Sequence, residues 1–389
     1  MNSLSKRQIL ASVNVCRIAD TTPSQTTYGA ARAVTGHAFC TASIKVVQTL
    51  VTAIAIALAL PLSPPTAAAP ANRPGFVYTA DENGNTVSRI DLETETVDIL
   101  PVGITPHNVQ FVPGNSLLLA VGLPLKDAGE GQHGNGHTAA EGKLVIIDTA
   151  AFPAGPVASI AVGGHPAHVI ADTQGRFAYV SNSEDDTVSV VDLDKREAVA
   201  TITTGDYPHG LRISPDGKAI YVANVQDGTV SVLDPITRTE TDRVAVGAAP
   251  VQVGFTPDGS RVYVSLRDDD KVAVINTATR KVIARIDVGR SPIQVHATPD
   301  GRFVYVANQG TEAEPDETAS VIDIASGSVA VTILTGKGAH GVTVSNDGAS
   351  AFVSNILAGT VSEISIAGQS VVRTYNVGKG PNGITYQAR

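Results

Sequence analysis

The chain has 389 residues, of which 43% are hydrophobic and 17% are charged, and its formal net charge is −9. This composition excludes a disordered polyelectrolyte and allows a sizeable buried core. Gly (36) and Pro (22) are frequent, as expected for a chain with many turns, and the absence of Trp argues against WD-repeat and Trp-docked propellers.

The first 71 residues are interpreted as an export leader. Lys45 precedes an apolar run over residues 46–62, and small residues then lead to Ala-Pro-Ala at 69–71. A basic residue, a short apolar run and an Ala-x-Ala-like site are typical of a signal peptide. The alternative is an uncleaved anchor, although a membrane span needs about 20 apolar residues. We therefore expect a secreted or periplasmic protein in which residues 1–71 are removed and 72–389 form the folded domain.

Loss of the leader changes the charge and the cysteine content. Residues 1–71 carry five basic residues and one acidic residue, so 23 basic and 36 acidic residues remain, a net charge of −13. Nucleic acid is then a poor partner, because phosphate binding needs clustered Lys and Arg. Cys16 and Cys40 leave with the leader, which excludes disulfides, thiolate metal sites and haem c. A membrane contact is expected only through an uncleaved signal.

A 42-residue repeat organises the chain after residue 75. In each copy a proline follows shortly after a Val-Gly or Thr-Gly pair, and in one copy alanine takes the place of the proline. These positions are Pro106, Pro166, Pro208, Pro250, Pro292, Ala339 and Pro381. Four of the six steps are 42 residues, the first is 60 and the fifth is 47. Seven copies of this length predict an all-β, seven-bladed β-propeller.

Each repeat contains four strand-like runs. In residues 208–247 they read PHGLRI, AIYVAN, TVSVLD and TDRVAVG, with Pro-Asp-Gly or similar turns between them. The pattern begins with a second-strand run at 76–80 and ends with a first-strand run at 381–387. We therefore expect the C-terminal strand to complete the first four-stranded antiparallel blade and close the ring.

The second strand of the repeat carries a recurring motif. It reads YVSN at 179–182, YVAN at 221–224 and 305–308, YVSL at 263–266 and FVSN at 352–355. Together with the Pro-His-Gly and Pro-Asp-Gly elements, it resembles the YVTN-repeat family of β-propellers over about residues 75–389. The resemblance implies an extracytoplasmic propeller related to lactonases, to the haem-binding domain of one nitrite reductase type, and to surface-layer or binding proteins.

Histidines and amides gather where the first strand of each repeat begins. We expect this residue set to surround the mouth of the central channel, with imidazoles along one arc and amides among apolar residues along the other. The set is His107, His165, His168, His209, Gln252, Gln294, His340 and Asn382. Apolar walls with a few polar groups are typical of a small-ligand pocket. The structural alternative is that each histidine simply bonds a backbone carbonyl.

A metal ion stays open as a cofactor, whereas no nucleotide-binding motif is present. Metal–nitrogen bonds are about 2.0–2.1 Å long, and imidazoles on separate blades are spread around the channel, so one shared ion is possible but not favoured. The 60-residue spacing between Pro106 and Pro166 indicates an insertion, which we place at 123–142, on the same face as the imidazoles. It contains His133 and His137 at helical spacing, but the glycines between them favour a flexible polar loop.

The function that these features favour is a binding scaffold for a small molecule or a protein partner. One alternative is a lactonase-like hydrolase or lyase with His and acidic residues as acid and base groups. Another is a cell-surface interaction module that uses the acidic loops of the same face, such as residues 268–270. No catalytic Ser-His-Asp set can be assigned, so enzymatic activity is left open.

Overall fold

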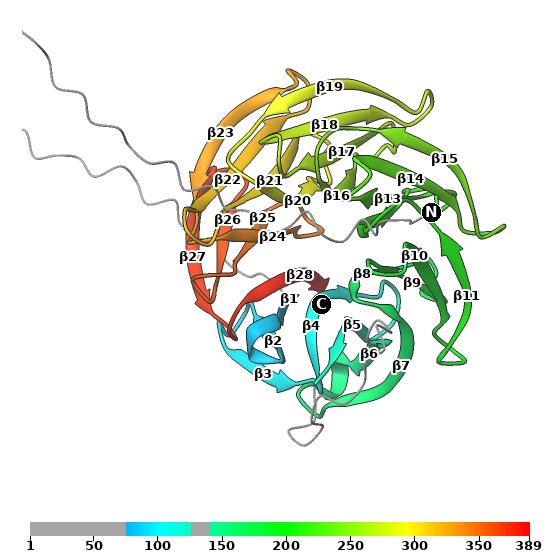
Figure 1. The fold of residues 1–389 in the computed structure, drawn as a ribbon. Helices are drawn as coiled ribbons and strands as arrows, with labels where there is room; N and C mark the ends of the chain where they lie inside the picture. Colours follow the sequence, from blue (N-terminus) through cyan, green and yellow to red (C-terminus); the bar gives the residue numbers. More distant parts are fainter. Residues whose placement is uncertain (1–74, 126–140) are drawn as a thin grey trace, which may run out of the picture. The chain divides into compact units, whose positions relative to one another are not determined.

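The computed structural model describes residues 75–125 and 141–389, which form seven four-stranded antiparallel sheets arranged around a channel (Figure 1). From the channel outward, blade 1 is β28 (Pro381–Ala388), β1 (Gly75–Asp81), β2 (Thr86–Asp91) and β3 (Val97–Pro101). Blade 2 is β4 (Ile104–Phe111), β5 (Leu117–Pro124), β6 (Glu141–Asp148) and β7 (Pro156–Gly164). Blade 3 is β8 (Pro166–Ala171), β9 (Phe177–Asn182), β10 (Thr187–Asp192) and β11 (Glu197–Thr203).

The remaining blades follow in chain order. Blade 4 is β12 (Pro208–Ile213), β13 (Ile220–Asn224), β14 (Thr229–Asp234) and β15 (Thr239–Ala245). Blade 5 is β16 (Pro250–Phe255), β17 (Arg261–Leu266), β18 (Lys271–Asn276) and β19 (Lys281–Asp287). Blade 6 is β20 (Pro292–Ala297), β21 (Phe303–Gly310), β22 (Pro315–Asp323) and β23 (Ser328–Leu334). Blade 7 is β24 (Ala339–Val344), β25 (Ser350–Asn355), β26 (Thr360–Ser365) and β27 (Ser370–Asn376).

The predicted seven-bladed propeller is confirmed, and so is its closure. β28 pairs antiparallel with β1, with Tyr386 opposite Val77 and Thr385 opposite Tyr78. Figure 1 shows the last strand lying beside the first, so the two ends of the described chain share one sheet. Two short 3-10 helices, η1 (Glu82–Gly84) and η2 (Thr149–Ala151), follow β1 and β6. Across the described ranges no helix has the length and apolarity of a membrane span. The predicted leader lies outside them.

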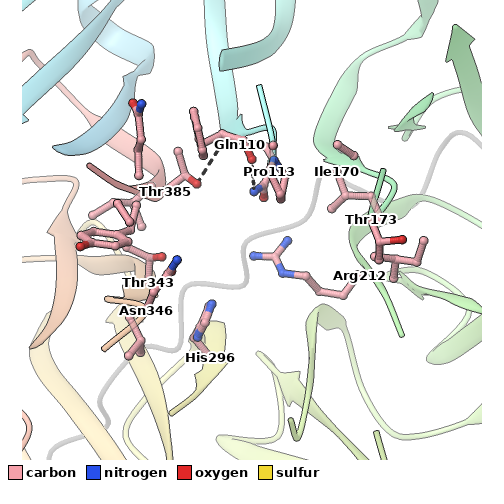
Figure 2. A pocket seen from close by; sticks show the side chains of 18 of the residues that line it. Gln110, Pro113, Ile170, Thr173, Arg212, His296, Thr343, Asn346 and Thr385 are labelled. Atoms are coloured by element: carbon pink, nitrogen blue, oxygen red, sulfur yellow. Dashed lines mark hydrogen bonds between the residues drawn. The ribbon is translucent and has the colours of Figure 1, made fainter. Parts of the chain in front are cut away.

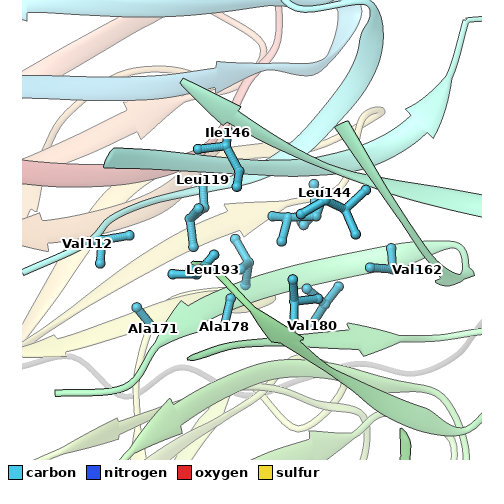
Figure 3. Close-up of a cluster of buried hydrophobic side chains, with 13 residues drawn as sticks. Val112, Leu119, Leu144, Ile146, Val162, Ala171, Ala178, Val180 and Leu193 are labelled. Atoms are coloured by element: carbon cyan, nitrogen blue, oxygen red, sulfur yellow. The ribbon is translucent and has the colours of Figure 1, made fainter. Parts of the chain in front are cut away.

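The hydrophobic core lies between the blades. In the described part of the chain, each of the seven interfaces between neighbouring blades has its own cluster of buried side chains. Figure 3 shows the cluster between blades 2 and 3, where Leu119 and Leu144 pack against Val169 and Val180. Because successive side chains of a strand point to opposite faces of its blade, the two faces contribute to two different clusters: Tyr221 faces blade 5 and Val222 faces blade 3.

In four of the seven blades, an Asn at the end of the second strand acts as a clamp to the third strand. Asn182 Nδ2 donates to Thr187 Oγ1 (3.0 Å) and Ser189 Oγ (2.9 Å) on the third strand. The same pair of bonds recurs at Asn224, Asn308 and Asn355. In blade 5, Leu266 takes the place of the Asn. Lys271 and Ala273 take the places of the Thr and Ser on the third strand, so the amide and both of its hydroxyl partners are replaced together.

Blade 1 has Asp81 at the clamp position. Its Oδ2 accepts from Thr86 Oγ1 (2.9 Å) and Ser88 Oγ (2.6 Å), and its Oδ1 accepts from Thr79 Oγ1 (2.7 Å). Asp81 is fully buried. Burial raises the pKa of its carboxyl to about 6, although the three hydroxyls oppose the shift.

The inner strands give the channel its layered lining. Counting the repeat proline as position one, position four is an apolar residue that belongs to an interblade cluster in all seven blades: Val109, Val169, Leu211, Val253, Val295, Val342 and Ile384. Because strand side chains alternate, position five lies on the other side of the strand and lines a channel cavity in six blades, although Ile170 also packs in the cluster between blades 3 and 4. A register shift follows the proline in each inner strand, and it turns position two toward the channel mouth as well.

Candidate functional site

Three imidazoles meet at one mouth of the channel. His107 on β4, His168 on β8 and His209 on β12 each present a ring nitrogen within 4.8 Å of the other two. His107 Nε2 lies 3.3 Å from His209 Nε2, and the rings of His168 and His209 are 4.8 Å apart between centroids. A shared ion, which the sequence leaves possible but does not favour, is compatible with the separation of these three imidazoles. Positions two and three point inward, where neighbouring inner strands converge.

The carboxylate of Glu82 and the amide of Asn382 lie next to Nδ1 of His107. Its Nδ1 lies 3.4 Å from Glu82 Oε1 and 3.1 Å from Asn382 Nδ2. Asn382 Nδ2 in turn donates to Glu82 Oε2 at 2.7 Å. Glu82 lies on η1, directly after the clamp residue of blade 1, and sequence reasoning placed it only among the acidic loops. A carboxylate behind a histidine is the usual orienting partner of a metal-bound imidazole.

The other two imidazoles are oriented from the blades beside them. His209 Nδ1 lies 3.2 Å from Val251 O, so Nδ1 donates the hydrogen bond and Nε2 presents its lone pair toward His107. His168 Nδ1 lies 3.3 Å from Gln252 Nε2. Gln252 reaches His168 across blade 4 because Gly210 leaves room: a Cβ there would lie 2.2 Å from Gln252 Oε1. The glycine of the Pro-His-Gly motif is thus required by this close approach.

Burial and neighbouring groups shift the pKa values of His168, His209 and Glu82. Burial lowers the pKa of His168 and of His209 well below the usual range, and neighbouring imidazoles lower both further. Burial would raise the pKa of Glu82, but the hydrogen bond and charge of His107, together with Asn382, lower it to about 2. At neutral pH, His168 and His209 are therefore uncharged and Glu82 is ionised.

Several buried polar atoms around the mouth have no hydrogen-bond partner in the described part of the chain. They are His165 Nδ1, His168 Nε2, Gln294 Nε2, His340 Nδ1 and Asn382 Oδ1. Buried polar groups are normally paired, so unpaired ones point to a bound ion, water or ligand. His168 carries the most weight here, because it is fully buried and belongs to the imidazole cluster.

A cavity of about 310 Å³ opens beside His107. Glu82, His107 and His165 supply its polar wall, and Leu123 and Leu125 supply apolar surface. These leucines belong to the first residues of the insertion at 123–142, and they line this cavity together with His107. His133 and His137 lie outside the described residues.

The remaining predicted residues have separate roles. Gln294 Oε1 accepts from Val342 N at 3.2 Å, which ties blade 6 to blade 7. His340 is buried, and burial lowers its pKa to about 4. His165 lies across the cavity, with its ring centroid 6.5 Å from that of His107. Sequence reasoning missed Arg212 and His296, which occupy position five of their inner strands at the other end of the channel.

Two family models match parts of the chain. The YNCE-like beta-propeller model matches residues 150–259, and the Cytochrome D1 heme domain model matches residues 262–367. Both support a place among β-propeller families, whereas the narrower YVTN-repeat assignment stays a prediction. No curated protein matches the chain.

Several solved structures are similar in fold. A functionally unknown protein from Desulfotomaculum acetoxidans has a TM-score of 0.67 at 16% identity, covering 80% of this chain and 99% of its own. A candidate 6-phosphogluconolactonase from Bacteroides uniformis has a TM-score of 0.64 at 17% identity, covering 81% and 100%. Kuenenia stuttgartiensis hydrazine synthase has a TM-score of 0.60 at 19% identity, covering 73% and 95%. At these identities the likeness shows the fold alone.

Proposed function

We propose that the protein is an extracytoplasmic binding scaffold that holds a divalent transition-metal ion, Zn²⁺ or Cu²⁺, through His107, His168 and His209. The observation that carries this proposal is the convergence of three ring nitrogens within 4.8 Å of one another. A tetrahedral ion with bonds of about 2.1 Å separates its ligands by about 3.4 Å. The spacing of 3.3 Å between His107 and His209 fits this value. Gln252 Oε1 accepts from Val253 N, so Gln252 Nε2 donates to His168 Nδ1 and the ring proton lies on Nε2. To complete the set, His168 would have to move inward and give up that proton together with the bond from Gln252.

Three protein ligands leave one coordination position for a small molecule. The cavity of about 310 Å³ beside His107 is where such a ligand would lie, between Glu82 and His165. Export of residues 72–389 after removal of the leader is part of this proposal, because the apolar run at 46–62 resembles a signal peptide.

The low pKa of Glu82 favours binding over acid/base catalysis. A general base works best when its pKa lies near the working pH, and a carboxylate with a pKa of about 2 is a weak proton acceptor at neutral pH. A lactonase-like activity is therefore the second candidate. It would be detected by hydrolysis of a panel of lactones, lost in Glu82→Gln.

Several carboxylates in the acidic loops of this face bind backbone N–H groups of the propeller, which argues against a loop surface reserved for docking a partner. Asp185 Oδ2 accepts from Gly164 N at 2.6 Å, and Asp269 Oδ2 accepts from Ala248 N at 2.9 Å. Asp316 Oδ2 likewise accepts from Arg290 N at 3.1 Å. These carboxylates hold the connections between neighbouring blades, so part of the acidic rim has a structural use.

Elemental analysis and native mass spectrometry of the mature protein test the metal site. We expect one Zn²⁺ or Cu²⁺ per chain, with affinity weakened at least roughly 100-fold in His168→Ala and roughly 10- to 100-fold in Glu82→Gln, an orienting residue. His296→Gln is the matched control, since this buried histidine lies at the other end of the channel. Unchanged metal affinity in His168→Ala would refute the site. An absorption spectrum of the same sample identifies non-covalent haem instead, which the name of the second matching family makes worth checking.

A further inference from the structure

A second cavity lies at the end of the channel opposite the imidazoles. It has a volume of about 790 Å³ and is lined by position-five residues of the inner strands, which Figure 2 shows converging on one space. They are Gln110, Ile170, Arg212, His296, Thr343 and Thr385. Position five lies three residues beyond position two, about 10 Å along the strand. Position three lies between them, and its side chains His168, Gln252 and Gln294 are buried.

Arg212 supplies the cationic group of this cavity. Its Nη1 donates to the carbonyl of the preceding residue, Leu211 O, at 3.0 Å. Among residues 75–125 and 141–389 no carboxylate forms an ion pair with it. Burial alone lowers the pKa of its guanidinium to about 10. Arg212 is partly buried and faces the cavity, so a bound anion would supply the counter-charge that the described residues do not.

The groups around Arg212 suit a polar anion. Figure 2 shows the Arg212 guanidinium and the His296 ring both directed into the cavity. His296 Nδ1 donates to Ala297 O at 2.9 Å, which leaves Nε2 as an acceptor. Burial and the charge of Arg212 lower the pKa of His296 to about 4, so the ring is neutral at pH 7. Asp172, the carboxylate on the rim, accepts from Arg176 N at 2.7 Å instead of pairing with Arg212.

We propose that this cavity binds a small hydroxylated organic anion, whose carboxylate or phosphate group pairs with Arg212. The planar fork of arginine binds either group through two parallel hydrogen bonds. A ligand hydroxyl would donate to His296 Nε2, and further hydroxyls would reach Gln110, Thr343 and Thr385. The site is separate from the metal site and does not depend on it.

Calorimetric titration of the mature protein with tartrate and with glycerol 3-phosphate tests the proposal, with glycerol as the uncharged control. We expect saturable binding of at least one anion and none of glycerol, and the two anions distinguish a carboxylate site from a phosphate site. Arg212→Gln should weaken binding roughly 10- to 100-fold. The exposed Arg243, which already pairs with Asp227 and Glu240, gives the control Arg243→Gln with unchanged affinity.

A second readout separates direct binding from a structural effect. An anion that neutralises Arg212 should raise the pKa of His296, followed by NMR titration of the His296 ring proton. Arg243→Gln should leave both measurements unchanged. If Arg212→Gln fails to fold, Arg212→Lys carries the test, because lysine keeps the charge but loses the fork and should weaken binding severalfold. Anion affinity that is equal in wild type and Arg212→Lys, or absence of binding up to about 10 mM of both anions, would overturn the proposal.

Discussion

Replacing Asp81 by Asn should stabilise the propeller at neutral pH and remove a pH dependence from its unfolding. Asp81 is the one buried carboxylate at a position where four other blades have Asn with the same hydroxyl partners. The amide can donate to those hydroxyl oxygens, as Asn182 does, and it carries no charge that burial would penalise.

The magnitude follows from the shifted pKa. The pKa of Asp81 rises from 3.8 to about 6 on folding. A difference of about 2 units corresponds to about 3 kcal/mol of unfolding free energy. Because the folded state has the higher pKa, this stabilisation is fully present below pH 3.8 and is lost as the pH rises through 6. The wild type should therefore lose about 3 kcal/mol relative to Asp81→Asn between pH 4 and pH 8.

Urea denaturation of both proteins at pH values between 4 and 8 measures this difference directly. The two unfolding free energies should be similar at pH 4 and diverge as the pH increases, with the variant more stable. Asn182→Asp is the reciprocal control: it places a carboxylate in the clamp of blade 3 and should introduce the same slope with a loss of stability at pH 8. Parallel curves for wild type and Asp81→Asn over this range would refute the reasoning.

Two further predictions concern the fold. Deletion of residues 381–389 removes the inner strand of blade 1, exposes β1 as a free edge and should abolish cooperative unfolding; a truncated protein whose circular dichroism melt matches wild type would contradict the closure argument. Leu266→Asn should destabilise the protein by roughly 2–3 kcal/mol, because its amide would be buried beside Lys271 and Ala273 with no hydroxyl partner. The triple variant that also carries Lys271→Thr and Ala273→Ser should recover much of that loss in the same denaturation assay, and an unchanged loss would count against the clamp.

The repeat made the blades predictable because each copy satisfies the same local requirements. The aspartates that end third strands illustrate this: Asp234 Oδ1 accepts from Ile236 N at 2.7 Å, and Asp323 Oδ1 accepts from Ser326 N at 2.7 Å. Such bonds form within a few residues, so sequence neighbours suffice to predict them. The closing strand was equally accessible, because the first and last copies are complementary halves of one blade.

The convergence of the imidazoles could not be predicted from the same pattern. It depends on the register shift after each repeat proline, which changes where positions two and three point and leaves no separate mark in the sequence. It also depends on the empty volume at Gly210 that lets Gln252 contact His168 from two blades away. Neither effect is local, so the spacing of residues along the chain does not give the separation of these side chains.

Arg212 and His296 show a different limit. Both lie at position five, where the other inner strands carry Gln, Ile, Gly or Thr. The repeat therefore shows only that these two residues differ from those at the same position in the other blades. Their meaning becomes clear only when position four is known to face the interblade core and position five the channel. A charged residue facing the core would have been a defect, whereas one facing the channel is available to a ligand.

The different roles of positions two to five of the inner strand explain how one repeat forms two channel ends with different side chains. Position four is apolar in every blade because each interblade cluster depends on it, and substitution there would disturb packing on both sides. Positions two, three and five carry no such common requirement, and they hold His, Asn, Gln, Arg, Thr and Gly in different blades. Since positions two and five are about 10 Å apart on the same strand, changes at one mouth leave the lining of the other intact. The propeller can therefore present imidazoles at one end and a guanidinium at the other without any change to the blades that carry them.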